Sequence, residues 1–358
     1  MDLIRPGDRG EAVRDVQHRL LASGLRVDRE ELEGTFGPAT EGSVREFQRR
    51  RGLPDDGIVG PDTWAELVEA GYRIGDRTLY LRSPAFRGDD VRELQRMLNA
   101  LGFDVGKEDG IFGGRTARGV TEFQRNVAQK TDGIVGLDTV RALERMRPAI
   151  GAPSRAMVRE AEVASRMRRP LAGSVIAIDP GHGAVDPGLD VAGGTEADLT
   201  FAIAADLAAE LTRRGATPLV LRRADDDPEV ADRARRANAA AAVTCVSLHL
   251  GGGALAPAGA VCCYFGTPST HSPMGRLLAE SIRSALTDAG LPDGGTRPLA
   301  IAILRETRMP AVQVELAVAA NEEEVARVTG DAATVIAALA DGIERFLGAG
   351  RQAAVATG

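Results

Sequence analysis

The chain has 358 residues, more than one hydrophobic core usually serves, so two or three domains are expected. A hydrophobic content of 44% with 27% charged residues is ordinary for a folded globular protein and argues against global disorder. The net charge of −7 gives no general attraction to nucleic acid or to an anionic membrane surface, so neither partner is expected.

The N-terminus shows no targeting segment, because no basic stretch followed by an apolar stretch follows Met1. Because no secretory signal is visible, a cytoplasmic location is predicted. No run approaches the ~18 apolar residues of a membrane span. Cys245, Cys262 and Cys263 lie in valine-rich segments, and adjacent cysteines pair poorly because a disulfide needs opposed Cβ directions. We therefore expect buried free thiols in a reducing compartment.

An internal repeat occupies the first 146 residues. The segment from Gly34 to Leu67 recurs from Gly110 to Leu143 at an offset of 76 residues, and upstream the offset is 78. The first copy therefore carries two extra residues, in a predicted loop around 28–33. Each copy has three stretches of helical apolar spacing separated by glycine-rich turns. The sequence predicts two small all-α three-helix modules, at residues 1–76 and 77–146.

Motifs in both copies resemble the peptidoglycan-binding type 1 domain. They read V-x-x-x-Q-x-x-L, then G-x-F-G-x-x-T, then D-G-I-V-G-x-x-T. The first copy departs with Glu33 at the aspartate that precedes the second motif, and the second copy has Ala128-Gln129 in place of Gly-Leu. The resemblance implies binding of cell-wall peptide stems or glycan. The alternative is that these modules are dimerisation or partner-docking helices.

A change in composition separates the repeat from the rest of the chain. Residues 147–172 are rich in Pro, Ala and Arg and form a predicted linker, with one helix expected at 156–167. From 173 to 347, short Val/Ile-rich strands alternate with amphipathic helices, which predicts an α/β domain with a mixed sheet and flanking helices. The strands are expected at 174–180, 217–223, 243–249, 259–266 and 310–316. The Ala/Gly-rich tail, 348–358, is expected to be disordered.

Four residues of the α/β domain make a candidate metal site. His182 and His249 directly follow predicted strands, where binding sites in open α/β sheets form. Glu196 begins the first long predicted helix, and Glu315 closes a further strand. Two imidazoles, one carboxylate and an open position describe a catalytic zinc site, and a second carboxylate describes its base. We therefore expect Zn²⁺ at His182, Glu196 and His249, with Glu315 as the catalytic carboxylate.

Each of these residues also has an ordinary interpretation. A histidine after a strand is often a hydrogen-bonding loop residue, and Glu196 can be a charge favoured at a helix N-terminus. Glu315 can be a salt-bridge partner of Arg308. His18, on a charged helix, and His271, in a loop, lack the strand-end setting, and His271 is at most a neighbour of the substrate. The zinc prediction therefore depends on the four residues occurring together.

The same residues lie in motifs that resemble the N-acetylmuramoyl-L-alanine amidase family of the amidase 3 type. I-D-P-G-H-G at 178–183 is similar to the first ligand motif, and Glu196 matches the ligand glutamate. S-L-H at 247–249 is similar to the third ligand motif, and P-A-V-Q-V-E-L at 310–316 to the strand with the catalytic glutamate. The resemblance implies hydrolysis of the amide between N-acetylmuramic acid and L-alanine of peptidoglycan or muropeptides.

Two other functions remain open, because the chain departs from the family pattern and because two helical modules precede its α/β domain. Four departures bear on substrate positioning and leave the metal ligands intact. They are Leu250 to Gly253, Ala317-Val318, Ala320 and Val243. The order of the parts, with Y-R-I-G-D-R-T-L-Y-L at 72–81 and L-R-E-T-R-M-P at 304–310, also resembles an actinobacterial amidase-like group. That resemblance implies a catalytically weak or inactive regulator that binds muropeptide or a lipid-linked precursor and controls a peptidoglycan precursor enzyme. A phage endolysin is the second alternative, since such enzymes also pair wall-binding modules with amidases.

Overall fold

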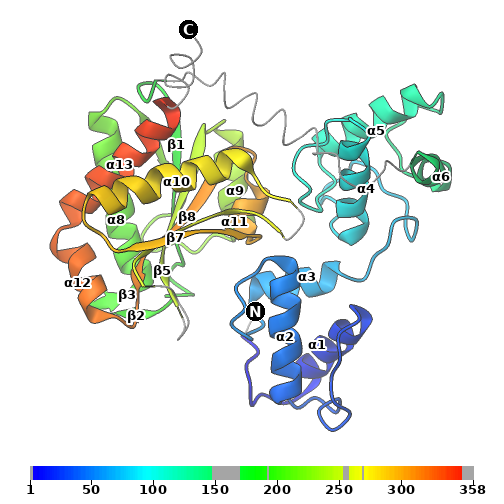
Figure 1. Cartoon of the computed structure of the whole chain (residues 1–358), viewed down its shortest axis with the longest axis horizontal. Coiled ribbons are helices and arrows are strands. Elements are labelled where there is room, and N and C mark those ends of the chain that lie inside the picture. Colours follow the sequence, from blue (N-terminus) through cyan, green and yellow to red (C-terminus); the bar gives the residue numbers. More distant parts are fainter. Residues whose placement is uncertain (1–2, 147–169, 192, 253–257, 268–269, 349–358) are drawn as a thin grey trace. The chain divides into compact units, whose positions relative to one another are not determined.

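The computed structural model describes residues 3–146, 170–191, 193–252, 258–267 and 270–348 (Figure 1). The chain divides into two compact units, Met1–Glu160 and Ala161–Gly358. The predicted linker helix at 156–167 lies outside the described residues, as does the predicted tail beyond Gly348. Within the described part, no helix is long and apolar enough to cross a membrane.

The N-terminal unit contains two groups of three helices. The first group is α1 (Glu11–Ala22), α2 (Pro38–Arg51) and α3 (Pro61–Glu69), and the second is α4 (Asp89–Ala100), α5 (Gly114–Asn126) and α6 (Leu137–Arg145). Each group packs around its own core, with Phe36 and Phe47 buried in the first and Phe112 and Phe123 in the second. The predicted helical modules are confirmed, whereas their boundaries at residues 76 and 146 stay predictions.

Buried glutamines hold the turns of both modules. Gln48 on α2 donates to the Ile58 carbonyl at 2.9 Å and to the Thr63 hydroxyl at 3.1 Å, and its Oε1 accepts from the Gly57 amide. Gln124 on α5 makes the corresponding contacts in the second module. A buried amide must find such partners. The glutamine, the glycine turn and the threonine therefore recur together in the repeat because each satisfies the others.

The two modules differ at the earlier glutamine of each copy. In the second module, Gln95 donates to Asp109 at 2.7 Å and accepts from the Gly110 amide at 2.8 Å. In the first module, where Glu33 replaces the aspartate, the Oε1 atom of Gln17 has no hydrogen-bond partner among the described residues. The Gly34 amide, which corresponds to the Gly110 amide, donates instead to the Glu31 carbonyl at 3.1 Å, so one buried acceptor is left unpaired in the first module.

Ion pairs connect the two modules. Arg51 of α2 donates to Asp89 of α4 at 2.7 Å. Arg92 of α4 lies 3.2 Å from Glu66 of α3, whose side chain is only 2% exposed. Since Arg51 also lies 3.8 Å from Glu66, charges from both modules share one largely buried network, here called the intermodule network and consisting of Arg51, Glu66, Asp89 and Arg92.

The C-terminal unit is built on a mixed sheet, as predicted, and this sheet has six strands. Its strand order is β4-β1-β5-β8-β6-β7, in which β6 is antiparallel to β8 and the other neighbouring strands are parallel. The strands are β1 (Val175–Pro180), β4 (Thr217–Val220), β5 (Thr244–Gly251), β6 (Ala260–Phe265), β7 (Asp293–Leu299) and β8 (Ala311–Val318). A short hairpin, β2 (Asp190–Val191) with β3 (Gly194–Thr195), follows β1.

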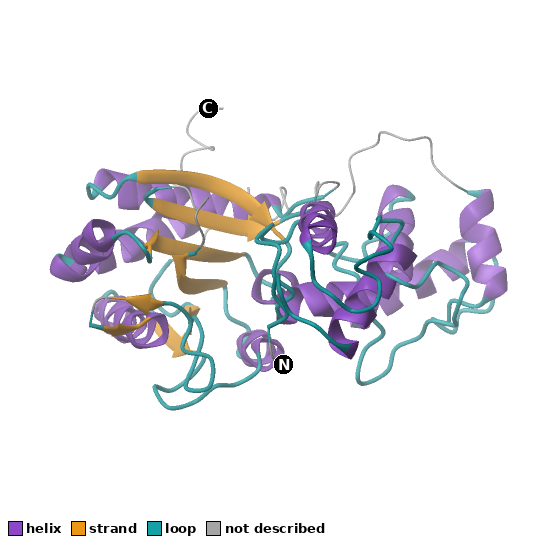
Figure 2. Cartoon of the chain, turned by 90° about the horizontal axis from the view of Figure 1, so that it is seen from below, coloured by secondary structure: helices purple, strands orange, loops and turns teal. Residues whose placement is uncertain are grey.

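Helices cover both faces of this sheet (Figure 2). On one face, α8 (Glu196–Arg213) and α10 (Pro273–Asp288) pack on the apolar residues of the strands. The helix α13 (Ala332–Gly348) packs on α8 and α10, and all three contribute to the main core. On the other face, α9 (Val230–Ala239) packs on α11 (Ala302–Glu306), which contacts β6 and β8. The helix α12 (Glu322–Gly330) follows β8. Cys245, Cys262 and Cys263 are buried and form no disulfide with one another, as predicted.

The strands differ from the predicted ranges in three respects. β4 ends at Val220, so Arg222 lies outside the strand that was predicted to contain it. β5 and β8 continue past His249 and Glu315, which therefore lie within their strands near the C-terminal ends. β7 was not predicted, because its sequence D-G-G-T-R-P-L contains residues that are rare in strands.

Candidate metal centre

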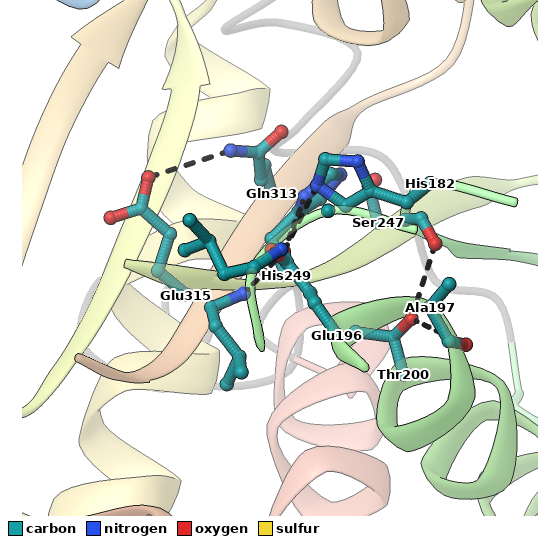
Figure 3. A network of polar contacts seen from close by, with 12 residues as sticks. His182, Glu196, Ala197, Thr200, Ser247, His249, Gln313 and Glu315 are labelled. Atoms are coloured by element: carbon teal, nitrogen blue, oxygen red, sulfur yellow. Dashed lines mark hydrogen bonds and ion pairs between the residues drawn. The ribbon is translucent and has the colours of Figure 1, made fainter. Parts of the chain in front are cut away.

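The structure brings His182, Glu196 and His249 together at the carboxyl ends of β1 and β5 (Figure 3). Each residue offers one ligand atom, and these atoms lie within 4.8 Å of one another. Glu196 Oε1 lies 3.2 Å from His182 Nε2 and 3.1 Å from His249 Nδ1. Segments that are 67 residues apart in the sequence therefore converge on one carboxylate oxygen.

Glycines allow this close approach. A Cβ atom on Gly181 would lie 2.5 Å from the His249 imidazole, and one on Gly188 would lie 2.7 Å from the His182 ring. Gly188 also has a φ of +72°, in the left-handed region that favours glycine. Gly181, in the I-D-P-G-H-G motif, and Gly188 therefore make room for the imidazoles.

His182 itself has a φ of +58°, which is unfavourable for a residue with a Cβ atom. Two buried arginines hold this turn. Arg233 of α9 donates to the His182 carbonyl at 2.7 Å and to Asp179 at 3.2 Å. Arg222 donates to the Gly181 carbonyl at 3.0 Å. These hydrogen bonds stabilise the backbone conformation that directs His182 toward Glu196.

Glu196 is the first residue of α8 and is only 1% exposed. Its oxygens accept hydrogen bonds from the backbone amides of Leu250, at 2.9 Å, and Leu189, at 3.2 Å. Burial opposes ionisation, but the contacts with His182 and His249 outweigh it and hold the pKa of Glu196 well below its usual range. Glu196 is therefore an ionised, fixed acceptor at neutral pH.

Asp186 orients the other side of the His182 ring, since its carboxylate lies 3.0 Å from Nδ1. Metal-binding histidines commonly make such a contact, which fixes the tautomer and the ring orientation. Burial lowers the pKa of His182, but the contacts with Glu196 and Asp186 outweigh it, so the pKa is raised above its ordinary value in the metal-free chain.

The donor set fits a zinc ion. In a tetrahedral zinc site with bonds of ~2.0–2.2 Å, neighbouring ligand atoms lie about 3.3 Å apart. The two measured separations of 3.1 and 3.2 Å around Glu196 Oε1 agree with that spacing. Two imidazoles and one carboxylate leave a fourth position for water or substrate, as in catalytic zinc sites.

Glu315 lies next to this cluster but does not belong to it. It is in register with His249 on the neighbouring strand, so both side chains emerge from the same face of the sheet. Its carboxylate points toward Gln313 and away from His182, Glu196 and His249 (Figure 3). The oxygens lie 2.8 and 2.9 Å from Nη2 of Arg297.

Other residues considered in the sequence lie elsewhere. The salt-bridge partner of Glu315 is Arg297, so the pairing with Arg308 was wrong; the Arg308 amide instead donates to Asn238. His18 is an exposed residue of α1, and the ring of His271 lies 6.2 Å from that of Tyr264. Neither histidine joins the described cluster.

Comparison with known proteins identifies relatives of both units. Residues 176–345 match the N-acetylmuramoyl-L-alanine amidase family, and residues 9–67 and 87–143 match the peptidoglycan binding domain. The chain is 36% identical over 339 residues to N-acetylmuramoyl-L-alanine amidase CwlM of Mycobacterium tuberculosis, covering 90% of this chain and 84% of that protein. It is 31% identical over 164 residues to CwlL of Bacillus licheniformis, covering 40% of this chain and 46% of that amidase.

Solved structures of amidases are also similar to part of this chain. The N-acetylmuramyl-L-alanine amidase Ami1 from Mycobacterium smegmatis is 25% identical, with a TM-score of 0.47, and the match covers 51% of this chain and 100% of that one.

Proposed function

This chain belongs to the N-acetylmuramoyl-L-alanine amidase family, and from that premise we propose that it is a zinc-dependent hydrolase. Its substrate is the amide between N-acetylmuramic acid and L-alanine in peptidoglycan or muropeptides. One observation carries the proposal: His182, Glu196 and His249 present three ligand atoms within 4.8 Å at the carboxyl edge of the sheet. The peptidoglycan binding domains at 9–67 and 87–143 support a cell-wall substrate.

The proposed roles follow from the chemistry of the residues. His182, Glu196 and His249 would hold zinc, which when bound makes water a nucleophile at neutral pH and polarises a carbonyl. Glu315 is the candidate general base and acid, because it emerges from the strand beside His249. It would accept a proton from the attacking water and pass it to the leaving amine of L-alanine. Arg233 and Arg222 keep the His182 turn in place.

Turnover of a defined muropeptide by the zinc-loaded chain tests this proposal. We expect release of a peptide that begins with L-alanine, and a decrease of about 10²- to 10⁴-fold in the Glu315→Gln variant. Zinc content should remain near one ion per chain in that variant, because Glu315 is not a proposed ligand. Absence of turnover in the zinc-loaded wild-type chain would exclude the amidase function.

One observation favours a second candidate, a regulator that binds muropeptide without hydrolysing it. Both oxygens of Glu315 face Arg297, so the proposed base is engaged away from the metal ligands. A regulator would bind muropeptide and retain zinc but release no peptide. The turnover experiment therefore separates the two functions, while a precursor enzyme as partner and a cytoplasmic location stay predictions.

A further inference from the structure

The salt bridge between Arg297 and Glu315 links the sheet edge to the candidate base. Arg297 lies on β7, the edge strand, and its side chain extends over β6 to reach Glu315 on β8. One nitrogen, Nη2, contacts both carboxylate oxygens, and Nε lies 3.4 Å from the sulfur of Cys263. While Arg297 holds both oxygens, the same carboxylate cannot point toward His182 and His249. The pair is therefore a resting arrangement of the candidate base.

Arg297 ends a row of polar residues that crosses the sheet. Five neighbouring strands place one such residue at matching register, and all five lie on the face opposite the main core. From β1 to β7 they are Asp179, Ser247, Gln313, Cys263 and Arg297. Asp179 and Ser247 are buried, whereas the side chain of Arg297 is 38% exposed. The row therefore opens to solvent at its β7 end.

The guanidinium has capacity for a second anion. Within the part of the chain that the structure describes, Nη1 of Arg297 has no hydrogen-bond partner. Cys263 adds no competing charge, because burial raises the pKa of its thiol to about 12. An arginine with a solvent-facing nitrogen can bind a further carboxylate, and two carboxylates then compete for one planar fork.

We propose that Arg297 binds a carboxylate of the substrate's peptide and thereby releases Glu315 toward the metal ligands. The inference rests on the proposed muropeptide substrate. It predicts that the β7 edge selects peptides with a free carboxylate close to the L-alanine. Arg297 would then be a positioning residue for the candidate base Glu315. The Arg297 guanidinium would exchange one carboxylate partner for another and so keep a counter-charge, while Glu315 becomes free to turn toward the metal ligands.

Two muropeptides that differ in one group test this inference. One carries a free carboxylate on the residue after L-alanine, and in the other that carboxylate is converted to an amide. Calorimetry on the metal-free full chain gives their affinities without turnover, and kcat and KM are measured on the zinc-loaded chain. We expect the wild-type chain to bind the carboxylate compound about tenfold more tightly, as expected for a charge-assisted hydrogen bond at a partly exposed group.

The variants Arg297→Gln and Arg297→Lys identify the residue responsible. In Arg297→Gln we expect equal affinity for both compounds. We also expect a higher kcat on the amidated compound than in the wild-type chain, because Arg297 no longer holds Glu315. Arg297→Lys should keep part of the preference, since it retains the charge but lacks the planar fork. Arg283→Gln is the matched control, because Arg283 forms an ion pair with Asp293 at the start of the same edge strand. It should behave as wild type.

The outcomes separate this inference from the proposed function. Equal affinity of the wild-type chain for both compounds, or a tenfold preference that survives in folded Arg297→Gln, overturns the role of Arg297. A wild-type chain that hydrolyses both compounds equally well retains the amidase function but loses the inference. A chain that prefers the carboxylate compound but hydrolyses neither supports the carboxylate site and overturns the hydrolase proposal.

Discussion

The two carboxylates of the candidate site are held in opposite ways. Glu196 is buried at a helix start, where two imidazoles and two backbone amides surround its oxygens. Glu315 contacts one cation, the partly exposed guanidinium of Arg297 on an edge strand, with longer contacts to Gln313 at 3.5 Å and to the Cys263 sulfur at 4.0 Å. His182, Glu196 and His249, here called the metal side, are therefore in place before any ligand binds. A competing anion can instead displace Glu315 from Arg297. Organisation of the metal site and readiness for catalysis are separable in this chain.

The largest expected effect distinguishes the two carboxylates directly. Glu196→Gln removes the charge from the proposed ligand set, so we expect zinc affinity to decrease more than 100-fold, beyond the effect of losing an outer contact. Glu315→Gln is the matched control and should retain about one zinc per chain. Elemental analysis after dialysis gives the zinc content per chain of both variants. Equal zinc content in the two variants would remove the contrast.

A smaller expected effect concerns the space between β1 and His249. In Gly181→Ala the new Cβ atom would lie 2.5 Å from the imidazole, so the ring or the β1 turn must move. We expect zinc affinity to decrease about 10- to 100-fold, as for other changes that misorient a ligand. Competition with a chromophoric chelator measures the affinity.

Gly42 provides the matched glycine control, because it lies in α2 with no atom within 4 Å of an added Cβ. Gly42→Ala should leave zinc affinity unchanged and raise the free energy of unfolding by roughly 0.5–1 kcal/mol. Unaltered zinc affinity in Gly181→Ala would show that the metal side tolerates more movement than its packing indicates.

A substitution of Asp186 tests whether a residue that contacts His182 from outside the ligand set affects zinc affinity. Asp186→Asn removes the charge that faces His182 Nδ1, and we expect zinc affinity to decrease about tenfold. The effect is smaller than that of Gly181→Ala because Asp186 is exposed and its position can be taken by water. The same chelator competition measures it, and a decrease as large as that of Glu196→Gln would contradict the proposed outer role of Asp186.

The smallest expected effect is a dependence on pH. In the metal-free chain the pKa of His182 is raised, so its contribution to stability is present below 6.5 and is lost as pH rises through the raised pKa. The lowered pKa of Glu196 has the opposite consequence: its contribution is present above 4.5 and is lost as pH falls. Zinc requires a neutral imidazole, so zinc binding at pH 6.5 should release about one proton.

Calorimetry in buffers of different ionisation enthalpy counts that proton. Zinc affinity should increase with pH by less than tenfold per unit and level off above the pKa of His182. Proton uptake on zinc binding would contradict this ionisation of the metal side.

Much of the fold follows from local sequence signals. The repeat predicts both helical modules, because each copy carries its own glutamine, glycine turn and aromatic core, such as Gln48 and Phe47 in the first. The convergence of His182, Glu196 and His249 could be anticipated because strand ends of a parallel sheet meet at one edge. Their role as zinc ligands, and that of Glu315 in catalysis, stay predictions.

Residues whose roles depend on distant contacts were missed. Arginines on a helix or after a strand usually face solvent, so nothing local marks Arg233 and Arg222 as buried supports of the His182 turn. Arg297 was missed because its strand contains glycine and proline and forms only beside β6. One signal in the sequence was available, because a buried carboxylate such as Glu315 requires a cation as partner. Arg308 was predicted as that cation, whereas the partner is Arg297.

The intermodule network has a consequence for how the N-terminal unit responds to heat or force. Arg92 of the second module lies against Glu66 of the first, and Arg51 of the first donates to Asp89 of the second, so melting one module removes contacts from the other. The two modules, although each has its own core, should therefore unfold in a single cooperative transition and behave as one mechanical element.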